Sequence, residues 1–489
     1  MLLHLLRTLL LSATCCSAFA APPAALPTEV DAALARARIP RDAVALLVLD
    51  ADNASAAPRL SHQAQTPMNP ASVMKLVTTY AALDLLGPVY TWSTPVYVDG
   101  AVRDGVLAGT VYIKGQGDPK LVLERLWLLL RRLQGRGIRQ IGGDIVLDRS
   151  AFDIPETDPA SFDGEPLRPY NAAPDALLIN YKSVVMTFTP DRATNTALVQ
   201  YDPPLAGVAT QPSVPLSSAE CGDYRTALKA DFSDASRIRF AGSYAADCGE
   251  KVWPTAYADP RSYALRAVQG LWQEMGGRLS GTVRYGTVPP TLLAGKPTLE
   301  ATSAPLSEII RDINKFSNNV MAQQLFLTMG RVVPTPEAAT PPADPAPLSG
   351  GSFVAARAVV QRWWKERMGS DDAPVLDNGS GLSRNERISA QALATLLLKA
   401  YRSPLMPELA ASLPLTGVDG TLKRFKSKVM ASAHLKTGTL SNVLARAGYV
   451  DGASGRRYVL VALVNHPNAN SDAARTAMET LVDWVAKDN

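Results

Sequence analysis

The stretch NPASVMKLVTTYAALDLLGP, residues 69–88, places a serine three positions before a lysine at the start of an apolar helical segment. Pro70 precedes the predicted helix, and Gly87 followed by proline ends it. Residues three apart share one face of a helix, so the amine of Lys75 can reach the hydroxyl of Ser72. A serine hydroxyl attacks when a base removes its proton, and a buried lysine with a lowered pKa can be that base. The stretch therefore predicts a nucleophile, Ser72, that is activated by Lys75.

Two more short motifs follow in the chain. KFSNN contains Ser317 and Asn319, and HLKTGTLSN contains Lys-Thr-Gly at residues 436–438. SVMK is the only Ser-x-x-Lys in the sequence and Lys-Thr-Gly occurs once, whereas Ser-x-Asn recurs at Ser383. We favour Ser317 because it lies between two helical segments, where its side chain can project into a cleft. Ser-x-x-Lys, Ser-x-Asn and Lys-Thr-Gly in this order are typical of serine enzymes that react with penicillin.

Each side chain in these motifs suits one step of acyl transfer. The hydroxyl of Ser317 can relay a proton between the attacked bond and the lysines. The amide of Asn319 offers a donor and an acceptor to a substrate amide. The ammonium group of Lys436 can hold the Ser317 hydroxyl and attract a terminal carboxylate. We therefore predict that Ser72, Lys75, Ser317, Asn319 and Lys436 are the catalytic residues.

The Lys-Thr-Gly segment supplies the expected substrate-binding residues. Gly438 lets a substrate backbone approach an edge strand closely. The hydroxyls of Thr437 and Thr439 can bind the carboxylate of the substrate. The backbone N–H groups of Ser72 and Thr439 are the expected oxyanion hole. Taken singly, Ser-Asn-Asn suits a helix cap and Lys-Thr-Gly suits a turn, but their joint order favours an active site.

Other catalytic designs lack the residues that they need. Three histidines, His62, His434 and His466, lie beyond the N-terminal segment, and none belongs to a His-Glu-x-x-His motif, so a zinc peptidase is not expected. The sequence contains no Gly-x-Ser-x-Gly, which disfavours an α/β-hydrolase triad. We interpret His434, two residues before Lys436, as structural. We expect neither a metal ion nor a cofactor.

Size and composition indicate a folded protein of more than one domain. The chain has 489 residues, of which 47% are hydrophobic and 19% are charged, and its formal net charge is +4. A chain of this length is too long to fold around a single hydrophobic core, so two or more domains are expected. No block of Lys and Arg residues supports nucleic-acid binding.

Residues 1–20 are typical of a cleaved secretory signal peptide. Arg7 stands in a short apolar run, and alanines at positions 18 and 20 fit a cleavage site. The run is too short for a membrane span, so we expect peripheral membrane association at most. Cys221 and Cys248 remain after cleavage. In an exported protein they are expected to form a disulfide, the alternative being two buried free thiols.

The hydrophobic pattern alternates between strand-like and helix-like regions. Short strands are predicted within residues 91–155 and 182–250, and a Pro/Ala-rich surface loop at 334–349. Further predicted elements are a buried strand at VALLVLD, helices at 259–276, 304–330 and FVAARAVVQRWWKERM, an antiparallel hairpin at LARAGYVDG and RRYVLVALVNH, and a final helix at DAARTAMETLVDWVAK.

With these motifs the chain resembles the class C low-molecular-mass penicillin-binding proteins, the D-alanyl-D-alanine carboxypeptidase/endopeptidases of the penicillin-binding protein four family. The resemblance rests on NPASVMKL, SAPLSEIIRDINKFSNNVMAQQLFL, DNGSGLSR, HLKTGTLSNVLARAGYV and RRYVLVALVNHPNA. It implies a mixed α/β (α+β) fold: a DD-peptidase/β-lactamase-like transpeptidase domain, with an antiparallel sheet flanked by helices, plus two nested, mostly-β inserted domains. The expected divisions are a penicillin-binding domain at 21–90 and 295–489, an inserted domain II at 91–172 and 259–294, and a nested domain III at 173–258.

The resemblance also implies a function. The enzyme would act in the periplasm as a serine D-Ala-D-Ala carboxypeptidase or DD-endopeptidase, through an acyl-enzyme on Ser72. Its expected partners are peptidoglycan peptides and β-lactam antibiotics, and a homodimer is left open. One alternative is a β-lactamase or esterase on the same fold, which needs a deacylating base that the sequence does not reveal. A second is a non-enzymatic cell-wall-binding module, against which the retention of every reactive residue argues.

Overall fold

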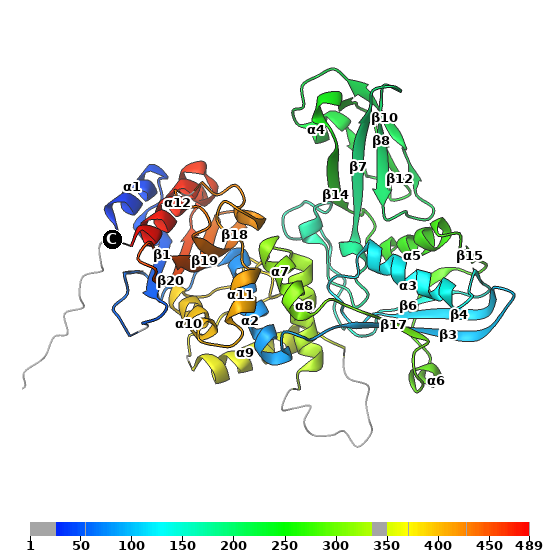
Figure 1. Cartoon of the computed structure of the whole chain (residues 1–489), viewed down its shortest axis with the longest axis horizontal. Helices are drawn as coiled ribbons and strands as arrows, with labels where there is room; N and C mark the ends of the chain where they lie inside the picture. Colours follow the sequence, from blue (N-terminus) through cyan, green and yellow to red (C-terminus); the bar gives the residue numbers. More distant parts are fainter. Residues whose placement is uncertain (1–25, 54, 335–349, 370, 427, 489) are drawn as a thin grey trace, which may run out of the picture.

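The computed structural model describes residues 26–53, 55–334, 350–369, 371–426 and 428–488. Figure 1 shows a rounded first body formed by both ends of the described chain, and beside it a second body, from which a sheet-rich lobe projects. The fold is of the mixed α/β class that the resemblance implies. The predicted signal peptide and residues 335–349 of the predicted loop lie outside the described residues.

The first body is built around a five-stranded antiparallel sheet in the order β18-β19-β20-β1-β2. Strand β20 pairs with β19 on one side and with β1 on the other, so the two ends of the chain share one sheet. The predicted C-terminal hairpin, β19 with β20, is confirmed. The strands are β1 (Val44–Asp50), β2 (Leu60–His62), β18 (Ala433–Leu440), β19 (Val443–Asp451) and β20 (Arg457–Asn465).

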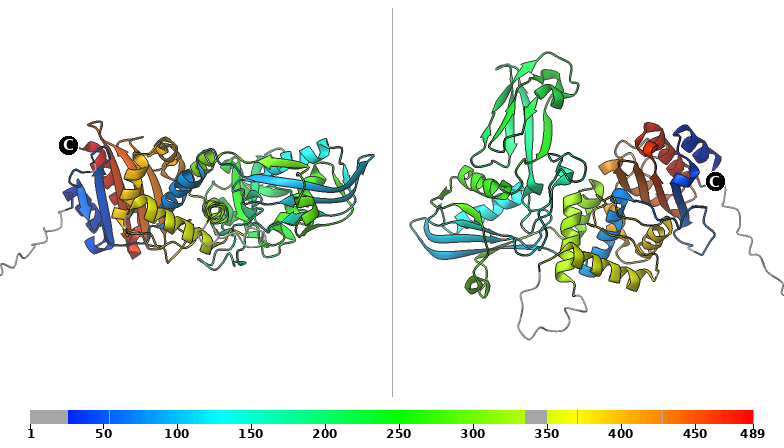
Figure 2. Two further views of the ribbon diagram at one scale, coloured as in Figure 1. Left: turned by 90° about the horizontal axis from the view of Figure 1, so that it is seen from below. Right: turned by 180° about the vertical axis from the view of Figure 1, so that it is seen from behind.

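Helices cover both faces of this sheet, as Figures 1 and 2 show. Successive residues of β1 therefore enter different cores. Leu46 packs in the cluster formed with helices α1 (Thr28–Arg36) and α12 (Asp472–Lys487). Leu47 packs in the cluster on the opposite face, which contains residues of α2 (Lys75–Leu86). Because both faces are buried, the strands are apolar almost throughout.

The helical layer beside α2 carries the second motif. The two helical segments predicted at 304–330 are α7 (Leu306–Lys315) and α8 (Asn319–Val332), and the chain turns between them. The side chain of Asn318 caps α8 by accepting from the Met321 N–H at 3.1 Å. The layer is completed by α9 (Phe353–Met368), α10 (Ala390–Tyr401) and α11 (Met406–Ser412).

The second body contains a seven-stranded sheet, the helices α3 (Leu123–Gly135) and α5 (Tyr263–Glu274), and the short helix α6 (Pro290–Leu293). Helix α3 was not predicted, because the residues around it have a strand-like pattern. Its own leucines recur at helical spacing, and Leu126, Leu129 and Leu133 are buried. The strands are β3 (Ser93–Arg103), β4 (Val106–Lys114), β5 (Gln140–Ile141), β6 (Ile145–Asp148), β15 (Arg278–Leu279), β16 (Val283–Tyr285) and β17 (Leu299–Thr302).

The projecting lobe contains a five-stranded sheet, β13-β10-β8-β7-β14, and a three-stranded sheet, β11-β12-β9. The predicted disulfide between Cys221 and Cys248 is present there, with a Cα–Cα distance of 4.8 Å. The elements are β7 (Ser183–Asp191), β8 (Thr196–Asp202), β9 (Ala209–Thr210), β10 (Ser213–Ser217), α4 (Tyr224–Leu228), β11 (Ala230–Asp231), β12 (Arg237–Phe240), β13 (Tyr244–Ala245) and β14 (Lys251–Ala256).

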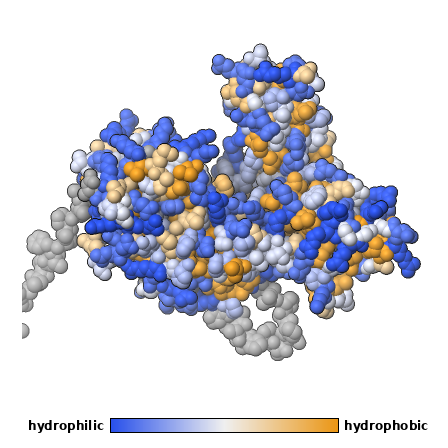
Figure 3. Space-filling view, in the orientation of Figure 1, coloured by the Kyte–Doolittle hydropathy of each residue, from blue (hydrophilic) through white to orange (hydrophobic). Residues whose placement is uncertain are grey.

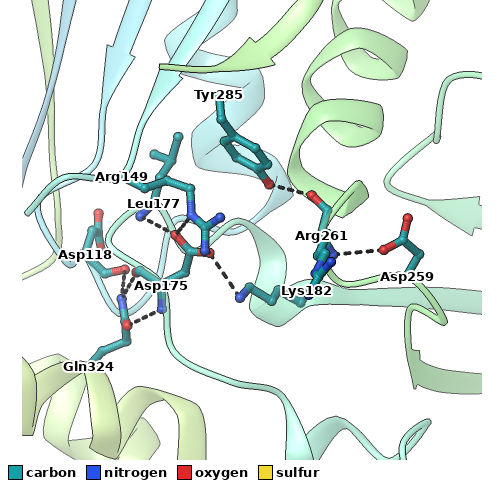
Figure 4. A network of polar contacts seen from close by, with 9 residues as sticks. All are labelled: Asp118, Arg149, Asp175, Leu177, Lys182, Asp259, Arg261, Tyr285 and Gln324. Carbon is teal, nitrogen blue, oxygen red and sulfur yellow. Dashed lines mark hydrogen bonds and ion pairs between the residues drawn. The ribbon is translucent and has the colours of Figure 1, made fainter. Parts of the chain in front are cut away.

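A buried polar network, drawn in Figure 4, ties helix α8 to the second body. Gln324 of α8 accepts from the Asp175 N–H at 2.9 Å and donates to the Asp175 carbonyl at 2.8 Å. The Asp175 carboxylate forms ion pairs with Arg149 at 2.7 Å and with Lys182 at 3.0 Å, and its side chain is 3% exposed. Because α8 begins at Asn319, this network fixes the second body relative to a predicted site residue.

Replacing Asp175 by alanine should destabilise the protein strongly. The change leaves the buried ammonium group of Lys182 and the guanidinium of Arg149 without their shared anion, and breaking a buried ion pair in this way costs about 3–5 kcal/mol. We expect a clear fall in the midpoint of thermal unfolding. The control Asp99→Ala removes an exposed carboxylate from the same body and should leave the midpoint nearly unchanged. Equal midpoints in the two variants would contradict this account of the network.

Candidate active site

Ser72 lies in a short 3₁₀ turn, Ala71–Met74, that runs directly into helix α2. Ala71 has a φ of +47°, which is rare for a residue with a side chain. The side chain of Asn69 holds this turn: its Oδ1 accepts from the Ala71 N–H at 2.8 Å, and its Nδ2 donates to the Ser383 carbonyl at 2.9 Å. The predicted first turn of an α-helix is thus a tighter, braced turn that presents Ser72.

Lys75 is fully buried, and its Nζ lies among three oxygen atoms. The Nζ is 2.9 Å from the Oγ of Ser72 and 2.7 Å from the Oδ1 of Asn319, and it also donates to the carbonyl of Ser380. A neutral amine has two hydrogens, for Asn319 and Ser380, and one lone pair, for the hydroxyl proton of Ser72. The arrangement therefore suits removal of the serine proton by the lysine.

The electrostatic surroundings of Lys75 favour the neutral amine. Burial lowers the pKa of Lys75 to about 7, and the charge of Glu386 acts against this shift. Glu386 is itself fully buried, which raises its pKa to about 7. Its Oε1 accepts from the backbone N–H groups of residues 377–379, in the loop that leads to the Ser380 carbonyl. Glu386 was not among the predicted site residues.

Ser317 lies in the break between α7 and α8, where its φ of +56° turns the chain. The buried Nζ of Lys436, on β18, is 2.9 Å from the Ser317 Oγ and 2.7 Å from the Thr437 carbonyl. Burial lowers the pKa of Lys436 well below its ordinary value, and the positive charges of Lys75 and Arg446 add to the shift. The two buried lysines are therefore close enough to influence each other electrostatically.

Gly438 brings β18 against the turn that carries Ser72. A Cβ atom at position 438 would lie 2.5 Å from the carbonyl oxygen of Pro70 and 3.1 Å from the backbone nitrogen of Ser72. A side chain would force these segments apart, so glycine is required here for steric reasons. On the same strand the side chain of Thr439 is exposed, whereas that of Thr437 is buried and shares a hydrogen bond of 2.8 Å with Thr421.

A cavity of about 370 Å³ lies beside the serine. The motif residues Ser72, Ser317, Thr437 and Thr439 line one part of it. The remaining lining, which sequence reasoning did not identify, includes the basic residues Arg424, Arg446 and Arg475 together with Glu479. A cavity with this excess of positive charge is suited to an anionic ligand.

The second body also reaches the site. The Nδ2 of Asn319 donates to the backbone carbonyl of Tyr170 at 3.1 Å. The hydroxyl of Tyr170 donates to Asp163 at 2.9 Å, and Asn171 donates to the same carboxylate at 2.7 Å, so the loop 163–171 is held in place. A contact through a backbone carbonyl leaves no signal in the sequence, and this one was not predicted.

The contacts separate the two Ser-x-Asn motifs. Ser317 bonds to Lys436, whereas Ser383 donates to the Asp377 carboxylate at 2.6 Å. Among the described residues no group of three or more His, Cys, Asp and Glu side chains is placed to hold a metal ion. The described part of the chain also contains no helix that is long and apolar enough to cross a membrane.

Known proteins are similar to this chain in sequence and in fold. The chain is 27% identical over 464 residues to a D-alanyl-D-alanine carboxypeptidase of Actinomadura sp. (strain R39), covering 89% of this chain and 80% of the relative. The fold is similar to that of penicillin binding protein 4 from Haemophilus influenzae, with a TM-score of 0.70, 21% identity and coverage of 94% and 98% of the two chains. It is also similar to a penicillin G-acylated predatory endopeptidase from Bdellovibrio bacteriovorus, with a TM-score of 0.52, 14% identity and coverage of 90% and 91%.

Both structural matches confirm the predicted fold. The Haemophilus protein covers 94% of this chain and the Bdellovibrio endopeptidase covers 90% of it. The model of the D-Ala-D-Ala carboxypeptidase 3 (S13) family matches residues 26–488. Since that match spans the whole first body, the second body and the projecting lobe, the chain belongs to the D-Ala-D-Ala carboxypeptidase 3 (S13) family of peptidases.

Proposed function

We propose that the protein is a serine carboxypeptidase in which Ser72 attacks the bond between the two terminal D-alanines of a peptidoglycan stem peptide. The Oγ bonds to the carbonyl carbon while its proton passes to the Nζ of Lys75. The C–N bond then breaks, and the departing amine of D-alanine takes the proton that Lys75 received, relayed through the hydroxyl of Ser317. Water hydrolyses the ester on Ser72 and releases the shortened peptide.

The remaining motif residues hold the substrate during these steps. The amide of Asn319 orients the peptide, and Lys436 with the hydroxyls of Thr437 and Thr439 attracts the terminal carboxylate. The backbone N–H groups of Ser72 and Thr439 form the oxyanion hole. Gly438 permits the close approach of β18 to the Ser72 turn, since a Cβ atom at this position would lie 3.1 Å from the Ser72 nitrogen. This closeness supports the placement of the two donors.

One observation carries the proposal: a fully buried lysine amine lies 2.9 Å from the nucleophilic oxygen, and its hydrogen-bond partners among the described residues are a hydroxyl, a side-chain amide oxygen and a backbone carbonyl. An ordinary structural lysine keeps its charge in water or beside an anion. Burying a charged ammonium group without an anion costs free energy, so this environment favours the neutral amine, which is the form that can act as a base.

The same chemistry predicts reaction with β-lactams. The amide bond of a β-lactam is strained and lies near a carboxylate. It therefore resembles the stem-peptide bond that Ser72 attacks. The Bdellovibrio endopeptidase with the same fold exists as a penicillin G-acylated protein, which supports this expectation. A lasting acyl-enzyme also separates this proposal from a β-lactamase.

The rate of acylation by benzylpenicillin should rise with pH through about 7. Below this pH the Lys75 amine is protonated and cannot accept the serine proton, whereas above it the amine is neutral. The Glu386→Gln variant should have its midpoint at lower pH, because the anion favours the protonated lysine. Stopped-flow rates across the range of about pH 5 to 9 measure both profiles. A flat profile in the wild-type protein would contradict Lys75 as the base.

A second activity, cleavage of cross-links between stem peptides, is favoured by a cavity beside Tyr170, the residue whose carbonyl accepts from Asn319. A cavity of about 760 Å³ lies between residues 165–170 and the projecting lobe, and Tyr170, whose carbonyl holds Asn319, lines it. Figure 3 shows the surface hollowed between the first body and this lobe. The second peptide of a cross-link would have room there.

Digestion of purified peptidoglycan, with the products identified by mass, tests the proposed function. A carboxypeptidase releases D-alanine from pentapeptide stems, and an endopeptidase converts cross-linked dimers to monomers. Rapid turnover of a chromogenic cephalosporin without a lasting adduct would instead indicate a β-lactamase or esterase. Release of no product and formation of no adduct would indicate a non-enzymatic wall-binding module.

We also propose that the enzyme acts in the periplasm, where its substrate lies. The predicted leader at residues 1–20 and the disulfide between Cys221 and Cys248 support export to an oxidising compartment. We further propose that residues 91–294 form the two inserted domains and that the flanking segments form the peptidase domain. The sheet shared by both chain ends supports this division.

A further inference from the structure

Arg446 occupies an unusual position beside the catalytic serine. It lies on β19, where its Cα is paired across the sheet with Thr437 of the Lys-Thr-Gly motif. Only 9% of its surface is exposed, and it lines the 370 Å³ cavity together with Ser72 and Thr437. Its neighbours along the strand, Ala445 and Ala447, are apolar and fully buried.

The guanidinium of Arg446 lacks an anion. Its Nη1 donates to the carbonyl of the preceding residue, Ala445, at 2.8 Å, and its buried Nε has no hydrogen-bond partner among the described residues. Burial lowers the pKa of Arg446 to about 10, so the side chain still carries its charge at neutral pH. Within the described residues no carboxylate lies within ion-pair distance of it.

The charged residues around the cavity do not supply this anion. Glu479, on α12, raises the pKa of Arg446 only from a distance, and its Oε1 accepts from the Lys426 N–H at 3.0 Å. Arg475, also on α12, is paired with Asp472 and repels Arg446. Within the described part of the chain, the buried amine of Lys436 hydrogen-bonds to the hydroxyl of Ser317 and to the carbonyl of Thr437, so it does not supply an anion either.

Burying a charge without a partner is costly, and such a group is normally paired or hydrogen-bonded. A carboxylate is the ligand that best fits an arginine, because two parallel N–H groups can bind its two oxygens. Substrate and penicillin each bring one carboxylate into this cavity under the proposed function.

We propose that Arg446 binds the terminal carboxylate of the substrate, together with the hydroxyl of Thr437, and thereby makes the enzyme specific for peptides that end in a free carboxylate. The inference rests on the proposed function, since it assigns a ligand group to the same site. Arg446 takes no proton and forms no covalent bond in this account; it determines which ligands Ser72 can reach productively.

The test compares benzylpenicillin, which has the carboxylate, with its methyl ester, which lacks it. Second-order rate constants of acylation are measured for wild type, Arg446→Leu, Arg446→Lys and the control Lys423→Leu, which removes an exposed positive charge outside the cavity lining. A charge-assisted hydrogen-bond pair predicts a loss of about 10-fold to 100-fold for the acid in Arg446→Leu. The ester should react at nearly the same rate in all four proteins, and Arg446→Lys should lie between wild type and Arg446→Leu for the acid.

The outcomes are separable. If acid and ester lose rate equally in Arg446→Leu, the arginine is structural and the inference is wrong; if neither loses rate, it is wrong as well. If wild type reacts with neither compound, the proposed function itself fails, whatever Arg446 does. Reaction of the ester also reports that each variant is folded.

Discussion

Replacing Ser72 by alanine should abolish both the release of D-alanine from stem peptides and covalent labelling by penicillin. The Ser72 Oγ is the atom that we assign to the acyl bond, and the methyl group of alanine cannot replace it. In serine peptidases, loss of the nucleophile lowers kcat by about a millionfold, and we expect a fall of that order. Intact-mass spectrometry after incubation with benzylpenicillin should show one added drug on wild type and none on the variant.

Two controls make this result specific. The Ser218→Ala variant removes an exposed hydroxyl in the projecting lobe and should be labelled like wild type. The midpoint of thermal unfolding of Ser72→Ala should stay near that of wild type, since the hydroxyl is only partly buried and α2 does not depend on it. Normal labelling of Ser72→Ala would place the nucleophile elsewhere.

Replacing Lys75 by methionine should slow acylation of Ser72 by about 10²-fold to 10⁴-fold, the scale of general acid–base catalysis. The Nζ that lies 2.9 Å from the Ser72 Oγ is lost, while methionine keeps an unbranched chain in the buried site. The Lys75→Arg variant should be about as slow, because a guanidinium stays charged and cannot take a proton. Rapid-quench acylation by benzylpenicillin measures all three proteins.

The thermal midpoint of Lys75→Met shows whether its loss of activity comes from lost catalysis or from lost stability. Methionine removes a costly buried amine, so the thermal midpoint of Lys75→Met should not fall, whereas activity should. The control Lys399→Met, on the exposed face of α10, should change neither quantity. Acylation of Lys75→Met within tenfold of wild type would contradict the assignment of this lysine as the base.

Much of the site could be predicted because several of its residues lie close together in the sequence, in short recognisable motifs. Ser72 and Lys75 are three residues apart, and a helical turn alone brings them together. The break at Ser317 is visible as a junction between two helical segments. The meeting of these segments with the Lys-Thr-Gly strand could be expected only through the family resemblance, because no local rule joins residues so far apart in the chain.

What could not be predicted depends on tertiary packing. The carbonyls of Ser380 and Tyr170 bind Lys75 and Asn319 through the backbone, which any residue type could supply. Helix α3 has leucines at helical spacing, but it lies inside a region of strand-like sequence. The strand-like residues on both sides led to a prediction of strands for the whole region. Arg446 did leave a signal: a charged residue between alanines in an apolar strand. Its meaning appears only with the cavity beside it.

Peptide mapping of the wild-type protein after reaction with benzylpenicillin tests most directly whether Ser72 is the nucleophile. We expect the drug on the peptide that contains Ser72 and on no other peptide, with labelling suppressed below about pH 6 while Lys75 is protonated. Label on the peptide containing Ser317 or Ser383, or a protein that remains unlabelled at pH values well above 7, would contradict the account.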